Sequence, residues 1–575
     1  MMYRPEHPNP QFERKNWINL NGKWDFAFDY GKSGIDRKLY LNNEEAEKSF
    51  VHTIEVPFCP ESELSGIGCK DFMNAVWYRR TVILTADQVK GRTILHFGAV
   101  DYEAHIYVNG FEVGKHIGGY ISFCNDITEH VHEGENTIVV CAIDDVRSGL
   151  QPVGKQCGNY YSFSCVYTRT TGIWQTVWME FVPENYVKEV KYYPDIAAQC
   201  FHIDCKVAGE GPIAFTALYE GKVVGSVTGT VWGDSNHLTL PVSELHLWEC
   251  GHGRLYDIII EYGADTVNSY AGMREVKIDG YKFKLNGKTV FQRTILDQGF
   301  YRDGIYTAPS DEILKRDIQL SMDLGFNGAR LHEKIFEQRF LYHCDKAGYL
   351  VWGEHANWGL DLSNPMALMR FLPEWMEEVR RDFNHPAIIG WCPFNETWDY
   401  CGRPQINEIL ENVYKITKAM DPTRPCIDTS GNFHVITDIY DIHNYDQWPE
   451  SFNNCYKNFP EDIQSMENYP HRQSYRKGLP LFISEYGGIK WDTSKEHADA
   501  WGYGDGPKTM EEFIERYRGL TKALLDQPYI MGFCYTQLYD VEQETNGLYD
   551  YDRNLKFDAE VIRTITAAPA AIEQD

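Results

Sequence analysis

The sequence has no long hydrophobic run and no concentration of positive charge. None of its apolar stretches approaches the roughly 20 residues of a membrane-spanning helix, and its first residues, MMYRPEHPNPQ, carry prolines where a signal peptide has an apolar core. The 575 residues include 55 basic and 83 acidic side chains, a net charge of −28, with no Lys/Arg run that could follow a phosphate backbone. We therefore expect neither a membrane nor a nucleic acid as partner.

The fifteen cysteines lack the spacings of redox and zinc motifs. They are scattered from Cys59 to Cys534, with no CxxC pair and no histidine-rich neighbour at zinc-ligand spacing. This pattern predicts reduced, mostly buried thiols in a cytoplasmic protein.

The first half of the chain contains many short strand patterns separated by turns. Apolar and polar residues alternate in WDFAFD from Trp24 and WYRRTVIL from Trp77, and Asn109-Gly110 separates two such runs as a hairpin turn. These patterns predict a jelly-roll β-sandwich over residues 1–183. A smaller strand-rich block at 184–277 has the length of one immunoglobulin-like β-sandwich.

From residue 278 onward, strand patterns alternate with helical ones. The eight candidate strands are VFQRTIL, GARLH, YLVWGEH, IIGWCPF, PCIDTS, IYDIHNY, LPLFIS and IMGFCYTQ. Amphipathic stretches such as SDEILKRDIQLSMDLG and INEILENVYKITKAMD lie between them. This alternation predicts a (β/α)₈ TIM barrel over residues 278–575, whose chemistry belongs at the C-terminal ends of its strands.

Two of these strands end on a glutamate. In DFNHPAIIGWCPFNETWD the strand ends at Glu396, and we expect Trp391, Phe394 and Trp398 to surround its carboxyl, raise its pKa and keep it protonated near neutral pH. The alternative is an ordinary surface glutamate at a strand end. In LPLFISEYGG the second strand ends on Glu485. A parallel barrel gathers such strand ends at one rim, and two carboxyls about 5–5.5 Å apart, one protonated and one ionised, hydrolyse glycosides with retention.

Further polar side chains follow the predicted strands. They are Arg330, His332 and Glu333 after strand two, Glu354 and His355 after strand three, Asn395 after strand four, and His443, Asn444 and Tyr445 after strand six. Each could instead neutralise a carboxylate in a structural ion pair. That alternative weighs most for Glu333, Glu354 and His355.

These residues lie in motifs that resemble glycoside hydrolase family two, which holds β-galactosidases, β-glucuronidases and β-mannosidases. FNHPAIIGWCPFNE is similar to the acid/base signature of the family and PLFISEYG to its nucleophile signature, while VNGFEVGKHIGGY and GIWQTVWMEF resemble its amino-terminal sugar-binding domain. The resemblance covers nearly the whole chain. It implies Glu396 as acid/base, Glu485 as nucleophile, Asn395 as donor to the sugar 2-hydroxyl, Tyr445 as the phenol beside the nucleophile and Arg330 as its electrostatic partner.

The implied reaction is double displacement by an exo-acting retaining enzyme that releases a terminal β-linked sugar from a glycoside or oligosaccharide. Neither carboxylate needs a metal ion or an organic cofactor, so we expect none. A homo-oligomer is plausible for this family.

The sequence departs from the family where the sugar is selected. Family members that cleave glucuronides carry an Asn-x-Lys motif after strand eight, but VEQETNGLYDYDR has no lysine. Where members commonly have a tryptophan at the end of strand eight, GFCYTQLYD leaves Tyr535 or Gln537. We therefore expect a galacto-configured sugar, from a β-galactoside or a β-galacturonide. The alternatives are a β-glucuronidase or β-mannosidase of the same family and, in another class, a non-catalytic carbohydrate-binding protein.

For a galacturonide, positive charge could come from Arg330, His332, His355 or Arg302. Trp398 and Tyr535 complete our candidate substrate-binding residues, together with Asn395, Tyr445, His443 and Glu354.

Overall fold

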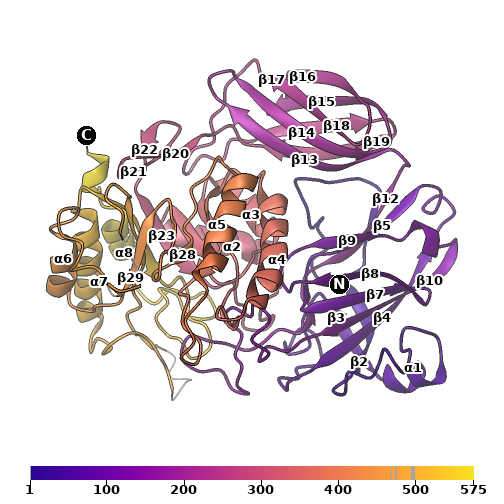
Figure 1. Ribbon diagram of the computed structural model, residues 1–575, viewed down its shortest axis with the longest axis horizontal. Coiled ribbons are helices and arrows are strands. Elements are labelled where there is room, and N and C mark those ends of the chain that lie inside the picture. The colour runs from indigo at the N-terminus through magenta and orange to yellow at the C-terminus, as the bar shows by residue number, and fades with distance from the viewer. Residues whose placement is uncertain (1, 468, 473–474, 494–498, 575) are drawn as a thin grey trace.

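The computed structural model describes residues 2–467, 469–472, 475–493 and 499–574. The chain forms two β-sandwiches and a barrel, which confirms the predicted architecture. In Figure 1 the first sandwich is indigo, the second is magenta and lies above it, and the barrel with its orange and yellow helices lies beside both. Within the described residues, no helix has both the length and the apolarity needed to cross a membrane.

The first sandwich packs a four-stranded sheet of order β1-β12-β5-β9 against a six-stranded sheet of order β3-β2-β4-β10-β7-β8. Its elements are β1 (Trp17–Asn19), β2 (Gly22–Phe28), α1 (Glu44–Ser49), β3 (His52–Val56), β4 (Ala75–Leu84), β5 (Arg92–Phe97), β6 (Val100–Asp101), β7 (Glu103–Val108), β8 (Phe111–Ile117), β9 (Phe123–Asp126), η1 (Thr128–His130), β10 (Gly134–Ile143), β11 (Gly172–Ile173) and β12 (Val177–Val182). Alternating apolar residues such as Phe26, Ile106 and Val140 point between the sheets and are fully buried.

The second sandwich has sheets of order β13-β14-β17 and β16-β15-β18-β19 and a hydrophobic core of its own. Its strands are β13 (Tyr186–Asp195), β14 (Cys200–Ala208), β15 (Gly211–Tyr219), β16 (Lys222–Val231), β17 (Ser235–Pro241), β18 (Tyr256–Tyr262) and β19 (Asp265–Ala271). The boundaries expected at residues 183 and 277 stay predictions.

A short antiparallel sheet of β20 (Val276–Asp279), β21 (Lys282–Leu285) and β22 (Lys288–Thr289) leads into the barrel. The barrel elements are β23 (Gln292–Asp297), α2 (Asp311–Asp323), β24 (Gly328–Leu331), α3 (Gln338–Ala347), β25 (Leu350–Glu354), α4 (Met366–Asp382), β26 (Ile388–Cys392), β27 (Phe394–Asn395), α5 (Asn407–Met420), β28 (Thr429–Ser430), β29 (Tyr440–Asn444), α6 (Pro449–Tyr456), β30 (Leu481–Gly487), α7 (Met510–Leu525), β31 (Ile530–Thr536), α8 (Ala559–Thr566) and η2 (Ala571–Glu573). All eight predicted strand segments contain a strand of this barrel.

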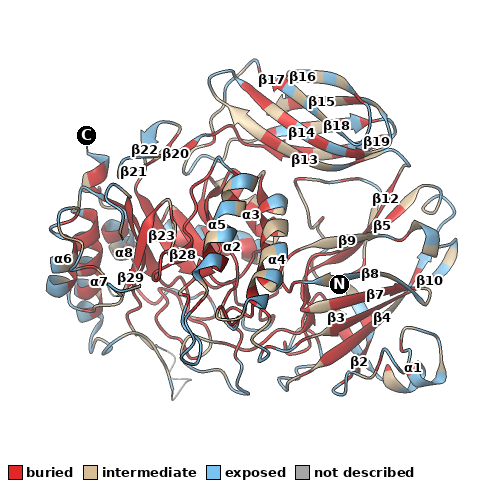
Figure 2. Cartoon of the chain, in the orientation of Figure 1, coloured by how far each residue is buried: buried red, intermediate tan, exposed pale blue. Residues whose placement is uncertain are grey.

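The barrel strands are parallel and almost entirely buried, because helices cover the outer face. Figure 2 shows these strands in red and the covering helices red on one side only. On α4 the inward stripe is Ala367, Phe371, Trp375 and Val379, four residues apart. Strand five is the shortest: β28 pairs with β27, and side chains of β28 and β29 meet where Ser430 Oγ donates to Asp441 Oδ2 at 2.6 Å.

The first sandwich and the barrel share one hydrophobic core. Tyr120, Tyr167 and Trp174 of the first sandwich belong to the buried cluster of the barrel. Tyr120 N also donates to Glu374 Oε1 on α4 at 2.7 Å. The first domain is therefore positioned rigidly enough to contribute residues to a site on the barrel.

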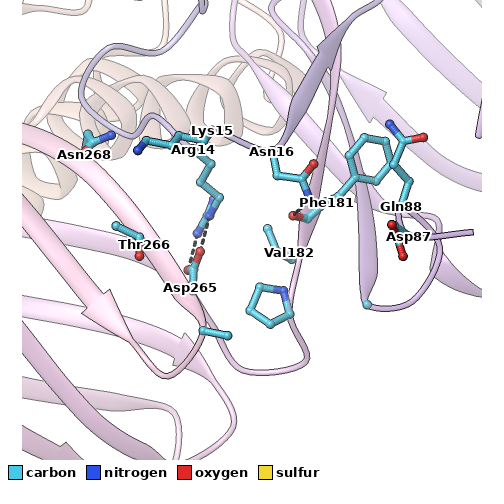
Figure 3. A pocket seen from close by; sticks show the side chains of 13 residues that line it. Arg14, Lys15, Asn16, Asp87, Gln88, Phe181, Val182, Asp265, Thr266 and Asn268 are labelled. Atoms are coloured by element: carbon cyan, nitrogen blue, oxygen red, sulfur yellow. Dashed lines mark hydrogen bonds and ion pairs between the residues drawn. The ribbon is translucent and has the colours of Figure 1, made fainter. Parts of the chain in front are cut away.

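A separate cavity of about 380 Å³ lies between the two sandwiches (Figure 3). At its wall, Arg14 donates to both oxygens of Asp265 at 2.8 and 2.9 Å and to Glu180 Oε2 at 2.8 Å. None of the predicted site residues lines this cavity. The buried ion pairs at the wall of this cavity join the two sandwiches, so we assign the cavity a structural role.

We expect Arg14→Met to destabilise this junction by about 3–5 kcal/mol, because it leaves two buried carboxylates without their partner. The thermal unfolding midpoint of the variant should fall clearly below that of the wild type. The neighbouring Lys15→Met is the matched control. Equal midpoints for all three proteins would contradict a stabilising role of the ion pairs.

Candidate active site

The structure brings the two predicted glutamates together at the C-terminal rim of the barrel. Glu396 directly follows β27, and Glu485 lies on β30 between β29 and β31. One carboxylate oxygen of each glutamate and a ring nitrogen of His443 all lie within 4.8 Å of one another. This separation is close to the roughly 5–5.5 Å of retaining glycosidases.

His443 on β29 bridges the two carboxylates. Its Nδ1 lies 2.6 Å from Glu396 Oε1 and 3.4 Å from Glu485 Oε2, and its Nε2 lies 3.0 Å from Ser430 Oγ. Burial opposes a charge on both partners, but the opposite charges prevail: Glu485 and then Glu396 raise the pKa of His443, and His443 lowers the pKa of Glu396. The proton therefore resides mainly on His443 in the unliganded site.

We expected an aromatic cup that raises the pKa of Glu396, and this prediction was wrong. Trp391 packs edge-on against Trp375 and Phe394 stacks on Phe371, so both rings face α4. Trp398 is 44% exposed and packs edge-on against the buried Phe433 and the half-buried Tyr469. We expected the rings beside the carboxyl because they are close to it in sequence, but the strand directs Trp391 and Phe394 toward the helix layer. A histidine from another strand is its neighbour instead.

Arg330 on β24 is the hub of the polar network. Its guanidinium donates to both oxygens of Glu354 at 2.5 and 3.0 Å, to Glu485 Oε1 at 3.1 Å and to Asn395 Oδ1 at 3.0 Å. A fifth bond reaches Ser484 O at 2.8 Å. The side chain is only 1% exposed, so Arg330 orients the carboxylate and the amide and has no free face for a sugar.

Tyr445 lies beside Glu485, and Asn395 belongs to the same polar network. The bond from Arg330 fixes the Asn395 amide, and its Nδ2 is buried without a hydrogen-bond partner within the described parts of the chain. That N–H is available to a ligand. The Tyr445 hydroxyl donates to Glu485 Oε2 and its ring stacks on Tyr503, with centroids 3.4 Å apart.

We predicted that Glu354, His355 and Tyr535 bind the substrate, but their side chains make other contacts. Both oxygens of Glu354 are taken by Arg330. His355 bonds Ala356 O at 2.6 Å and its Nε2 lies 3.3 Å from Glu374 Oε2 on α4. Tyr535 packs between the rings of Tyr486 and Tyr517, toward α7. Strand residues alternate between the barrel interior and the helix layer, and this alternation decides the direction of His355 and Tyr535.

The remaining candidates divide between the site and the surface. His332 Nδ1 lies 3.8 Å from Glu485 Oε1, and burial, with Lys155 and Arg330, lowers its pKa well below the usual range, so it is neutral. Trp398 lines a pocket of about 330 Å³ together with Glu396, which fits the leaving-group side. Arg302 pairs with Asp552 at 2.7 Å at the surface.

Behind His443, a buried chain of polar groups crosses the end of the barrel. Ser430 Oγ joins His443 to Asp441, and His434 bonds Asp428 Oδ1 at 2.7 Å and lies 3.1 Å from Asp441 Oδ1. Burial disfavours the imidazolium, but the two aspartates outweigh it and raise the pKa of His434 to about 10.

The sequence prediction missed a contribution from the first domain. Residues 144–171, between β10 and β11, form a long segment in which no α-helix or extended strand occurs. Its Lys155 and Tyr167 reach the barrel rim, where the Tyr167 hydroxyl donates to Glu544 of the loop after β31. Loops of this length in compact domains are commonly functional, a signal that the sequence offered.

Two groups of side chains have the proximity of metal ligands. One is Glu396, His443 and Glu485, and the other is Asp195, Cys200 and His202 on the second sandwich. In the first group the 2.6 Å contact is a direct hydrogen bond between His443 and Glu396.

The fold and site together define a glycosidase, an enzyme that hydrolyses O-glycosyl bonds. Residues 18–167 match the model of the sugar binding domain of glycosyl hydrolases family 2, and residues 276–563 match the model of the TIM barrel domain of that family. The chain belongs to glycoside hydrolase family 2.

The relatives are distant in sequence and close in fold. The β-glucuronidase of Felis catus is 25% identical and the human β-glucuronidase is 24% identical; each match covers 92% of this chain, and 84% and 83% of those proteins. A relative from Formosa agariphila is 25% identical over 72% of this chain, which spans about half of that protein. The solved structure of β-glucuronidase from Ruminococcus gnavus in complex with D-glucuronic acid aligns with a TM-score of 0.79 at 20% identity, covering 98% of this chain and 100% of that one.

We expect His434 to stabilise the barrel in a pH-dependent manner. Since its pKa rises from 6.5 to about 10 on folding, its contribution is fully present below pH 6.5 and is lost as the pH rises toward 10. The thermal midpoint of the wild type should exceed that of His434→Gln most at pH 6 and least at pH 10. His237→Gln, at an exposed ion pair of the second sandwich, is the control. A difference that is constant from pH 6 to 10 would contradict this assignment.

Proposed function

We propose that the protein is an exo-acting retaining β-glycosidase that releases a terminal β-linked uronic acid, with D-glucuronic acid as the leading candidate. The observation that supports this reaction is that oxygen atoms of the Glu396 and Glu485 carboxylates lie within 4.8 Å of each other at the barrel rim. At that separation one carboxylate can attack the anomeric carbon directly, with no water between them.

Glu485 is the nucleophile in this mechanism. Arg330 and the Tyr445 hydroxyl each bond one of its oxygens and hold the carboxylate in place. It attacks the anomeric carbon through an oxocarbenium-like transition state and forms a glycosyl-enzyme intermediate. The N–H of Asn395 donates to the sugar 2-hydroxyl, a contact that strengthens in the transition state.

Glu396 is the general acid, and His443 stores its proton. With the proton on His443, the transfer to Glu396 crosses a single 2.6 Å hydrogen bond. Glu396 passes it to the leaving oxygen, and in the second step it deprotonates the water that releases the sugar. Because Glu396 and His443 share one proton, Glu396 can be protonated when the leaving group needs it, although the pKa of the resting carboxylate is lowered.

The sugar assignment replaces the galacto-configured sugar expected from the sequence. The relatives that align over 92% of the chain are named β-glucuronidases, which supports the glucuronide alternative over a galactoside or mannoside. Exo action is supported by the first domain, whose residues 149–168 cover one side of the site. A cytoplasmic location and a homo-oligomer remain part of the proposal, with all fifteen cysteines free in the structure.

We expect Glu485→Gln to lower kcat by about 10⁴-fold or more, because the amide cannot form the covalent intermediate. Steady-state hydrolysis of a nitrophenyl glycoside and the thermal midpoint are the measurements, and the fold should be intact. Retention of most of kcat would overturn the nucleophile assignment. The matched variant Glu396→Gln should lose less with nitrophenolate, a leaving group that needs little protonation, than with an alkyl leaving group.

A panel of nitrophenyl glycosides tests the sugar. We expect kcat/KM for the β-D-glucuronide to exceed that for the β-D-galactoside and β-D-mannoside by at least about 100-fold, the ratio that one charged contact typically supplies. The β-D-galacturonide separates recognition of the carboxylate from recognition of the 4-hydroxyl. Activity restricted to neutral glycosides would refute the uronide assignment.

A further inference from the structure

A loop of the first domain docks into the barrel rim between two barrel loops. Residues 149–168, which we call the docking loop, bind the loop after β25, where Val153 N donates to Trp358 O at 2.8 Å. On the other side, Gln543 Nε2 of the loop after β31 donates to Ser164 O at 2.7 Å, and Thr168 N donates to Glu542 Oε1 at 3.0 Å. The docking loop is therefore held at both flanks of the catalytic rim.

The position of Lys155 within the docking loop is fixed by its neighbours. Gly154 has a φ of +59°, and a Cβ there would lie 2.3 Å from Glu333 O, so only glycine allows this approach to the barrel. Tyr167 N donates to Lys155 O at 2.7 Å across the loop. The backbone thus directs the lysine side chain inward.

The ammonium group of Lys155 is buried without a counterion in contact. The residue is 5% exposed, and its Nζ lies 3.9 Å from the centre of the Trp358 ring. Among the described residues, no hydrogen bond joins Nζ to another group, and no carboxylate oxygen lies within 4.0 Å of it. A buried charge in such surroundings is unusual unless a ligand completes them.

The acids around Lys155 are occupied by other partners. Glu544 accepts from the Tyr167 hydroxyl and from Asn546 Nδ2. Burial raises the pKa of Glu333 to about 8, so this carboxyl is largely protonated at neutral pH. Glu485 is bonded by Arg330, as described above. Burial disfavours the charge on Lys155, but Cys165 and then these acids raise its pKa through space, and none of the described acids forms an ion pair with it.

Lys155 is close enough to the catalytic pair to act on the same sugar. Burial raises the pKa of Glu396, whereas His443 and, after it, the charge of Lys155 lower it. Trp358, beneath the ammonium of Lys155, donates to Asn395 O at 3.1 Å. Of the other basic groups near the pair in the described chain, Arg330 is saturated by protein acceptors, His443 is engaged by Glu396 and Glu485, and His332 is neutral.

We propose that Lys155 binds the carboxylate of the terminal uronic acid and thereby selects uronides over neutral glycosides. This inference rests on the proposed function and assigns the specificity of the barrel site to a residue of the first domain. Charge complementarity supports it: an ammonium that has no ion pair with any described residue, near the catalytic carboxylates, matches the one negative group that distinguishes a uronide from a neutral hexoside.

The experiment compares the wild type with Lys155→Met and Lys155→Arg on nitrophenyl β-D-glucuronide and β-D-glucoside. We expect Lys155→Met to lower kcat/KM for the glucuronide by about 100-fold, mainly through KM, and to lower kcat/KM for the glucoside by a factor at least tenfold smaller. Lys155→Arg should recover at least a tenth of the wild-type uronide activity. Lys115→Met, an exposed lysine of the same domain, is the control.

Inhibition gives a second readout. Sodium D-glucuronate should inhibit the wild type at least tenfold more strongly than D-glucose, and Lys155→Met should lose this preference. If Lys155→Met does not fold, Lys155→Gln, which preserves a chain packed on Trp358, takes its place. Uronide activity within twofold of an active wild type would overturn the role of Lys155 and leave the proposed function standing. A wild type that cleaves only neutral glycosides would overturn both.

Discussion

The active site depends on one buried guanidinium. Arg330 bonds Glu354, Glu485 and Asn395 at once, and each of these side chains comes from a different barrel strand. A charge that is 1% exposed is stable only when its acceptors surround it, so the same contacts that satisfy Arg330 also fix the carboxylate of Glu485, our proposed nucleophile, and the amide of Asn395. Precise placement of the reacting groups follows from the requirement to neutralise that charge.

The second constraint is the sharing of a proton. Glu396, His443 and Glu485 each have a carboxylate oxygen or ring nitrogen within 4.8 Å of the other two. The neighbouring Glu485 and Glu396 raise the pKa of His443, and His443 in turn lowers the pKa of Glu396. When a glycoside separates these groups, the proton can return to Glu396. The pKa of Glu396 is thus determined by a neighbour on another strand and not by an apolar environment.

The site is also divided between domains. The barrel provides the carboxylates, whereas the docking loop of the first sandwich provides Lys155 and Tyr167. The shared hydrophobic core around Trp174 and Tyr120 makes this division workable, because it holds the loop against the rim. A sandwich of the sugar-binding type therefore acts here as part of the pocket. The second sandwich, with its separate core, contributes no residue to the network described.

The sequence by itself determined the architecture and the reacting pair. Apolar strand patterns alternating with amphipathic helices specify a barrel whatever the loops do, and Glu396 and Glu485 end two of those strands, so closure of the barrel had to bring them to one rim. Only the tertiary structure decided the surroundings of the pair. Side-chain direction at strand ends sent Tyr535 and His355 into the helix layer, and a contact between segments far apart in the chain placed Lys155 beside the glutamates. Periodicity encodes which face of a strand is buried, but the neighbours of a buried charge depend on how all strands and loops pack together.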